Sequence, residues 1–177
     1  MFRNFTFACL VLLLGGGNVH AATVQYLPGP PPDPHHAHTR FGDADTSSGM
    51  LSIAGQQTLP RAAGNGSLFV EKIGQVGDTD FLLLTSTGNA LCPASYSIVR
   101  VDSSGIAIPT AFFGNCNDHH EVQIVHGQDI AVIQPEFTSS EADTPRTITV
   151  YSNSTRRLAE NGTPLRAGCP NNLCDGL

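Results

Sequence analysis

The sequence predicts an all-β domain: a single antiparallel sandwich, partial barrel or curved sheet of about eight short strands, stapled by disulfides. Short apolar or alternating runs recur along the chain, and turn residues separate them about every ten residues. No stretch of about twelve residues has the period of an amphipathic helix. Four of the five cysteines follow the predicted leader, which is typical of a cross-linked exported fold.

A cleavable secretory signal is expected to occupy residues 1–21. Arg3 gives the start a positive charge, residues 5–14 form an apolar run, and Val19 and Ala21 are the small side chains that signal peptidase accepts. The run is about half as long as the roughly 20 residues that span a bilayer. We therefore predict export to the periplasm or the medium, with no membrane association after cleavage.

The charge of the mature chain excludes two classes of partner. Of nine Lys and Arg residues Arg3 leaves with the signal, so eight bases face fifteen acids and the net charge is −7. Nucleic acids and anionic membranes bind through clustered basic residues, and the only basic pair is Arg156-Arg157. We predict neither as a partner. An exported protein partner with a basic surface suits this charge better.

A flexible arm rich in proline and histidine is predicted over residues 22–48. Its segment Leu27–Pro34 holds five prolines and has no apolar period, which is typical of an extended or polyproline-type chain. Residues 42–49 have the composition of a loop. The β-domain is expected to begin at residue 49 and to end in a disulfide-closed tail at residue 177.

Eight runs within the β-domain have the pattern of strands. The run that contains Phe81–Leu84 is apolar without interruption, which indicates a strand buried on both faces. Pro109 predicts an edge strand or a bulge, since proline cannot donate to a sheet ladder. Gly127-Gln128 is expected to connect a tight hairpin. The predicted strands are 50–54, 68–73, 80–85, 96–102, 106–113, 121–126, 129–134 and 146–152.

The mature cysteines are Cys92, Cys116, Cys169 and Cys174, and an even number in an exported domain predicts disulfides. Three connectivities are possible. The most local one, Cys92–Cys116 with Cys169–Cys174, is favoured, and closure of its longer loop stabilises the fold by about 3 kcal/mol in the chain-entropy model. The spacing lacks the paired C-x₂-C knuckles of a thiolate zinc site and the C-x-x-C of a redox site.

Two histidine clusters are candidate metal ligands: His35, His36 and His38 in the arm, and His119 and His120 in a loop after Cys116. Neutral imidazoles bind zinc, copper or nickel, but a structured site needs three or four ligands held by neighbouring groups. Adjacent histidines in a strand or loop also tend to point in different directions. We therefore interpret these residues as solvated loop histidines, and we predict no cofactor.

No catalytic residue is assigned. The chain has no G-x-S-x-G, H-E-x-x-H or S-x-x-K motif, and carboxylate pairs of the glycosidase type are not recognisable from spacing. Asp43-x-Asp45 and Asp78-x-Asp80 look like fragments of calcium loops. The first lacks the Gly and Glu that an EF-hand needs at its sixth and twelfth positions, so both are interpreted as turn residues.

Residues 77–116 carry the most distinctive pattern of the chain. Gly77-Asp-Thr-Asp80 opens an apolar strand, Cys92-Pro-Ala-x-Tyr96 opens another, and Phe113-Gly-Asn-Cys116 follows. This pattern resembles one found in small exported β-rich domains of proteobacteria. The resemblance implies a periplasmic β-domain with a Cys92–Cys116 disulfide, and it brings no catalytic residue.

These observations favour a non-enzymatic module that binds an exported protein, such as an inhibitor or immunity-type protein. The loop at His119-His120 and the C-terminal tail loop are expected to form the contact surface, because loops carry function on rigid β scaffolds. Two alternatives stay open. One is an envelope metal-binding protein that uses the histidine-rich arm, and the other is a hydrolase of unrecognised type.

Overall fold

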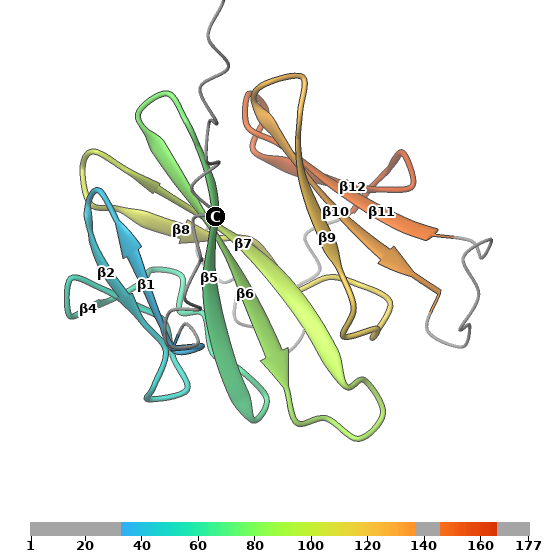
Figure 1. The fold of residues 1–177 in the computed structure, drawn as a ribbon, viewed down its shortest axis with the longest axis horizontal. Coiled ribbons are helices and arrows are strands. Elements are labelled where there is room, and N and C mark those ends of the chain that lie inside the picture. The colour runs from blue at the N-terminus through green and yellow to red at the C-terminus, as the bar shows by residue number, and fades with distance from the viewer. Residues whose placement is uncertain (1–32, 137–145, 166–177) are drawn as a thin grey trace, which may run out of the picture. The chain divides into compact units, whose positions relative to one another are not determined.

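A computed structural model of the chain describes residues 33–136 and 146–165. In these ranges the chain forms strands and no helix, which confirms the all-β class predicted from the sequence (Figure 1). The strands make three antiparallel sheets, none of them closed into a barrel. The described part of the chain thus contains no helix long and apolar enough to cross a membrane.

The N-terminal sheet consists of four short strands in the order β1-β2-β3-β4, and they are β1 (His36–Thr39), β2 (Gly42–Asp45), β3 (Ser52–Ile53) and β4 (Gln56–Gln57). Arg40 and Phe41 form the turn between β1 and β2, because Thr39 pairs with Gly42. Gly42 has φ 126°, and an added Cβ would lie 2.7 Å from the Cβ of Ala54, so the close approach of β2 to β3 requires glycine here.

The central sheet has the order β5-β6-β7-β8, and its strands are β5 (Ser67–Val76), β6 (Thr79–Thr87), β7 (Ala94–Asp102) and β8 (Ala107–Pro109). The turn Gly77-Asp78 joins β5 to β6, with Gly77 at φ 55° as a two-residue hairpin turn requires. The register shifts between Lys72 and Gly74, so β5 carries a bulge there. Pro109 lies on the edge strand β8, as predicted.

The C-terminal sheet has the order β13-β12-β11-β10-β9, and its strands are β9 (Glu121–Val125), β10 (Asp129–Pro135), β11 (Arg146–Ser152), β12 (Arg157–Glu160) and β13 (Thr163–Pro164). Strands β9 and β10 form the hairpin predicted from the sequence, with His126 and Gly127 both at positive φ in its loop. Strands β12 and β13 are not among the predicted strands, because they are only four and two residues long.

Two hydrophobic cores lie on opposite faces of the central sheet. Leu82 and Leu84 of β6 pack with the N-terminal sheet, where Ala37 and Ala44 are buried. Phe81 and Leu83 of β6 pack on the other face with Ile130, Val132 and Tyr151 of the C-terminal sheet. The side chains from Asp80 to Leu84 are fully buried, since successive residues of a strand point to opposite faces. The apolar run of β6 therefore lies in the middle layer of three, as the sequence indicates.

The predicted flexible arm differs from the structure over residues 36–45, which form the β1–β2 hairpin. Ala37 and Ala44 face each other across the hairpin and enter the core, while the histidines and aspartates between them point outward. Alanine is a weak indicator of a buried strand because its side chain is small. The neighbouring prolines favour an irregular chain, so the sequence pattern predicts an arm here and not a hairpin. Residues 1–32, and with them the predicted signal and the start of the arm, lie outside the described residues.

Loss of a β6 core side chain should lower the free energy of unfolding more than loss of an exposed leucine. We expect Leu84→Ala to lower the free energy of unfolding by about 3 kcal/mol, from lost burial and the cavity left behind. Leu91 is 91% exposed in the loop after β6, so Leu91→Ala should change it by less than about 0.5 kcal/mol. Urea denaturation of both variants measures the difference, and equal effects would contradict the burial of Leu84 in the core shared with the N-terminal sheet.

Candidate functional site

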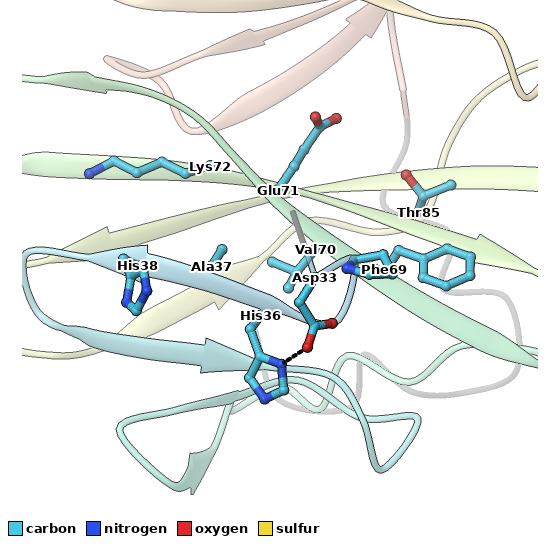
Figure 2. A pocket seen from close by; sticks show the side chains of 10 residues that line it. Asp33, His36, Ala37, His38, Phe69, Val70, Glu71, Lys72 and Thr85 are labelled. Carbon is cyan, nitrogen blue, oxygen red and sulfur yellow. Dashed lines mark hydrogen bonds and ion pairs between the residues drawn. The ribbon is translucent and has the colours of Figure 1, made fainter. Parts of the chain in front are cut away.

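A groove of about 480 Å³ lies along the edges of β1 and β5 (Figure 2). Phe69 and Val70 give it an apolar wall, and Asp33 and Glu71 bring negative charge to its rim. Strand β5 is the first strand of the central sheet and β1 the first of the N-terminal sheet, so both are edge strands. The side chains that line the groove come from Asp33, Pro34, His36, Ala37, His38, Phe69, Val70, Glu71, Lys72 and Thr85.

Backbone polar groups of β5 face this groove. The Val70 N–H points away from β6 and donates to the carbonyl of Pro34, with an N···O distance of 2.9 Å. Backbone groups alternate in direction along a strand, so those of Lys72 point the same way as those of Val70. Among the described residues, the Val70 carbonyl and the N–H and carbonyl of Lys72 have no hydrogen-bond partner.

Strand β1 presents the matching edge on the other side. The His35 carbonyl accepts a hydrogen bond from the Thr46 N–H at 2.9 Å, which sets the side of β1 that pairs with β2. The backbone groups of His36 and His38 therefore point to the opposite side. Within residues 33–136 and 146–165, the N–H and carbonyl of His38 have no hydrogen-bond partner. Two incompletely paired strand edges thus flank one groove.

Asp80 anchors one end of this arrangement. Its carboxylate is fully buried, and it accepts hydrogen bonds from the Arg40 N–H at 2.8 Å, the Arg40 Nε at 2.7 Å and the Lys72 Nζ at 2.8 Å. Burial by itself would raise the pKa of Asp80, but the hydrogen bonds from Lys72 and Arg40 outweigh it and hold the pKa below the usual range. The hydrogen bonds from Arg40 fix the β1–β2 turn against β6, and the ammonium group of Lys72 is bound to the same carboxylate.

Glu71 lines the groove from β5, and its carboxylate points away from the β1–β2 hairpin (Figure 2). Its Oε1 lies 2.9 Å from Nε2 of His120, whose ring centroid is 4.9 Å from that of Tyr96. The hydrogen bond to Glu71 raises the pKa of His120 against the opposing effect of burial. Burial raises the pKa of Tyr96 to about 12, so its hydroxyl stays protonated and donates to the Asn117 carbonyl at 2.9 Å.

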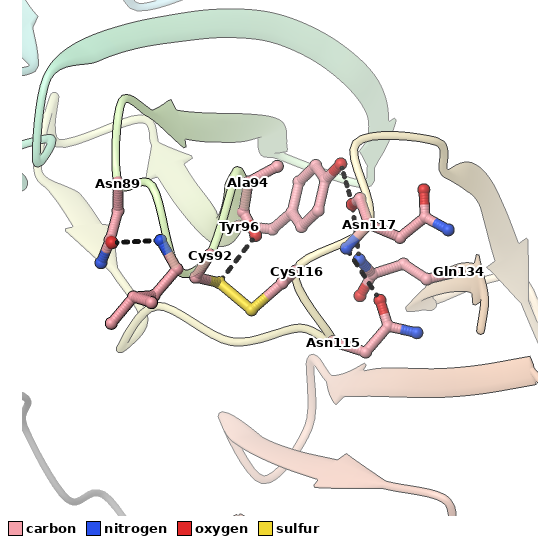
Figure 3. Close-up of a disulfide and its surroundings, with 9 residues drawn as sticks. Asn89, Cys92, Ala94, Tyr96, Asn115, Cys116, Asn117 and Gln134 are labelled. Carbon is pink, nitrogen blue, oxygen red and sulfur yellow. Dashed lines mark hydrogen bonds between the residues drawn. A yellow bond between two sulfur atoms is a disulfide. The ribbon is translucent and has the colours of Figure 1, made fainter. Parts of the chain in front are cut away.

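The disulfide Cys92–Cys116 holds the segment that carries His119 and His120 (Figure 3). Beyond Cys116, the Asn117 carbonyl accepts hydrogen bonds from the Tyr96 hydroxyl and from Gln134 Nε2, which joins the central sheet to β10. The disulfide itself confirms the predicted pairing of Cys92 with Cys116. Cys169, Cys174 and the predicted tail loop lie outside the described residues.

The structure separates the predicted histidine ligands. Nδ1 of His35 donates to the Leu68 carbonyl at 3.0 Å, and its ring packs on Phe69. His36 and His38 point outward from β1, with their Nδ1 atoms 2.9 Å and 2.7 Å from Asp33 and Asp43. His119 is exposed beside Asp118, apart from these. Among the described residues, no three His, Cys, Asp or Glu side chains are gathered as metal ligands.

A nucleophile–base pair would need a hydroxyl in contact with a histidine. In the described ranges, Thr46 Oγ1 lies 3.4 Å from His35 Nδ1. Thr46 is only 1% exposed, however, and the same Nδ1 is closer to the Leu68 carbonyl. This pair is therefore out of reach of a substrate.

The structure adds several residues that the sequence did not single out for function: Arg40, Lys72, Glu71 and Asp33. Arg40 and Glu71 act through partners about forty or more positions away, which no local spacing reveals. Comparison of the chain with protein-family models, curated proteins and solved structures found no match.

Replacing Asp80 should destabilise the protein more than replacing the neighbouring Asp78, which is exposed in the β5–β6 turn. We expect Asp80→Asn to cost about 3 kcal/mol, at the low end for a buried ion pair because Arg40 and Lys72 regain contact with water. Asp78→Asn should cost less than about 0.5 kcal/mol. The pKa of Asp80 is lower in the folded than in the unfolded protein. Its contribution to the free energy of unfolding is therefore present above the unfolded pKa and is lost as the pH falls through the folded pKa. Chemical denaturation across this acid range tests both statements, and an acid profile unchanged in Asp80→Asn would contradict the second.

The pKa of His120 should depend on Glu71. We expect the NMR titration of His120 in the native protein to lie above the ordinary histidine value, and Glu71→Gln to lower it. Because the folded pKa is raised, the stabilisation is complete below the unfolded pKa and is lost as the pH rises through the folded pKa. The matched variant Glu121→Gln, on β9, should leave the titration unchanged. A His120 pKa that responds equally to both variants would show that the contact is absent in solution.

Proposed function

We propose that this chain is an exported, non-enzymatic β-domain that binds another exported protein, in the manner of an inhibitor or immunity-type protein. The observation that carries the proposal is the groove between β1 and β5, where two strand edges present unpaired backbone groups of described residues on either side of an apolar wall. An extended segment of a partner can pair with such an edge, and its side chains can enter the groove alternately.

The charges of the groove favour a basic segment. Asp33 and Glu71 line it with side chains that are 58% and 52% exposed. Among the described residues their carboxylates form ion pairs only with His36 and His120, whereas the permanent charge of Lys72 is bound to Asp80. The whole chain has a net charge of −6, so its field attracts a basic partner from a distance. The partner is therefore expected to supply Lys or Arg beside the residues that pair with the strand edge.

Two further features support the proposal. The Cys92–Cys116 disulfide and the signal-like start of the chain are consistent with an oxidising compartment outside the cytoplasm. In the described residues, the one hydroxyl in contact with a histidine, that of Thr46, is buried, which favours binding over hydrolysis by a serine- or threonine-type mechanism. The resemblance of residues 77–116 to exported proteobacterial domains also supports export, as part of this proposal.

The test begins with capture and ends with affinity. Purified protein with its disulfides formed is immobilised and exposed to envelope extract and culture supernatant, and a stoichiometric partner is then purified. We expect Glu71→Lys to weaken the affinity of that partner by about tenfold, because it reverses a charge at the groove. Glu160→Lys makes the same charge change on β12, away from the groove, and should leave the affinity within about twofold.

Calorimetry or surface plasmon resonance gives both dissociation constants, and circular dichroism verifies that the variants fold. Equal weakening by Glu71→Lys and Glu160→Lys would exclude the groove as the binding site. A hydrolytic turnover that disappears on substitution of one polar residue would overturn the non-enzymatic assignment.

A further inference from the structure

The outer face of the β1–β2 hairpin brings two histidines opposite two aspartates. His36 pairs in register with Asp45, and His38 pairs with Asp43. Ala37 lies between the two histidines and Ala44 between the two aspartates, and both alanines are buried. All four polar side chains therefore lie on the opposite, outward face. Figure 2 shows His36 and His38 projecting to the same side of β1, away from Ala37. Opposite residues of an antiparallel pair have Cβ atoms about 5 Å apart, within reach of a shared ligand.

His36 is held in the orientation of a metal ligand. Its Nδ1 lies 2.9 Å from Asp33 Oδ2, so in the neutral ring Nδ1 carries the proton and Nε2 has the free electron pair that a metal ion needs. Metal-bound histidines are typically oriented in this way, by a carboxylate on the other ring nitrogen. Asp33 precedes the hairpin and adds a fifth polar side chain beside the four on its face.

The Nε2 atom of His36 faces Asp45 at a distance that does not suit a hydrogen bond. Nε2 and Oδ1 are 3.6 Å apart, beyond the range of a well-formed N–H···O bond. Two ligands at about 2.1 Å from a tetrahedral ion are separated by about 3.4 Å. The gap between His36 and Asp45 is therefore close to the spacing at which one ion bridges an imidazole and a carboxylate.

His38 and Asp43 supply the remaining ligands one row further along the hairpin. Their Nδ1 and Oδ1 atoms are 2.7 Å apart, and the side chains are 91% and 71% exposed. As they stand, the described side chains gather no three ligands at one point. Rotation of the exposed His38 and Asp43 side chains toward His36 and Asp45 requires no movement of the backbone or of the core.

We propose that the outer face of the β1–β2 hairpin binds one divalent transition-metal ion through His36, His38 and Asp45, with Asp43 as a fourth ligand and Asp33 orienting His36. Two imidazoles with carboxylates match zinc, copper and nickel, whereas calcium and magnesium take oxygen ligands alone. Copper(II) should bind most tightly of the three, following the usual order of divalent affinities. The site shares Asp33, His36 and His38 with the lining of the groove, but it uses their side chains, whereas the strand pairing proposed there uses the backbone. Titration with metal salts alone therefore tests the metal site without any protein partner.

Metal titration of the purified protein tests the proposal with zinc and copper(II) salts alone as probes. We expect isothermal titration calorimetry to give one ion per chain, and NMR to show the ring signals of His36 and His38 shifting together. The double variant His36→Asn/His38→Asn should weaken zinc binding by at least about tenfold. Asp33→Ala should weaken it by about tenfold, since it removes the acceptor that orients His36 without removing a ligand.

The matched control is His119→Asn/His126→Asn, which removes the same number of exposed imidazoles elsewhere and should retain the wild-type affinity. Circular dichroism verifies that each variant folds. The proposal is overturned if the wild-type protein binds no stoichiometric ion. It is also overturned if the two double variants lose affinity equally, because binding would then reflect exposed histidines in general.

Discussion

Strand β6 is buried on both faces, and the two cores of the domain depend on it. Leu82 and Leu84 hold the N-terminal sheet, and Phe81 and Leu83 hold the C-terminal sheet. Neither outer sheet has another apolar layer of described residues to cover its inner face. The central sheet therefore fixes where the edges of the outer sheets fall, and so where a groove or an exposed face can form.

Asp80, near the start of β6, also links this strand to the N-terminal sheet. It lies one residue before the core and faces the N-terminal sheet, where Arg40 and Lys72 neutralise it. The hairpin is thereby held by a charged contact at its turn and by Ala37 and Ala44 along its length. Such small contacts leave the other face of the hairpin free for His36, His38, Asp43 and Asp45. Structural and chemical roles are thus divided between alternate residues of the same two strands.

The strands with large apolar side chains could be predicted from the sequence, because their period and their turns are local properties. Examples are the buried run Phe81–Leu84 and the edge position of Pro109. The Cys92–Cys116 pairing could be predicted as well, because it is the most local choice for Cys92. The β1–β2 hairpin could not, since alanines carry its apolar pattern and prolines precede it. The ion pairs of Asp80 and Glu71 could not either, because their partners come from distant strands and only the fold brings them together.

Native-state hydrogen exchange tests the central role of β6 most directly. If both cores depend on this strand, the amides of Phe81, Leu82, Leu83 and Leu84 should exchange only through global unfolding. Their exchange free energies should then agree with one another and with the free energy of unfolding from denaturation. The account is contradicted if one outer sheet and β6 exchange together through a partial opening while the other core stays protected.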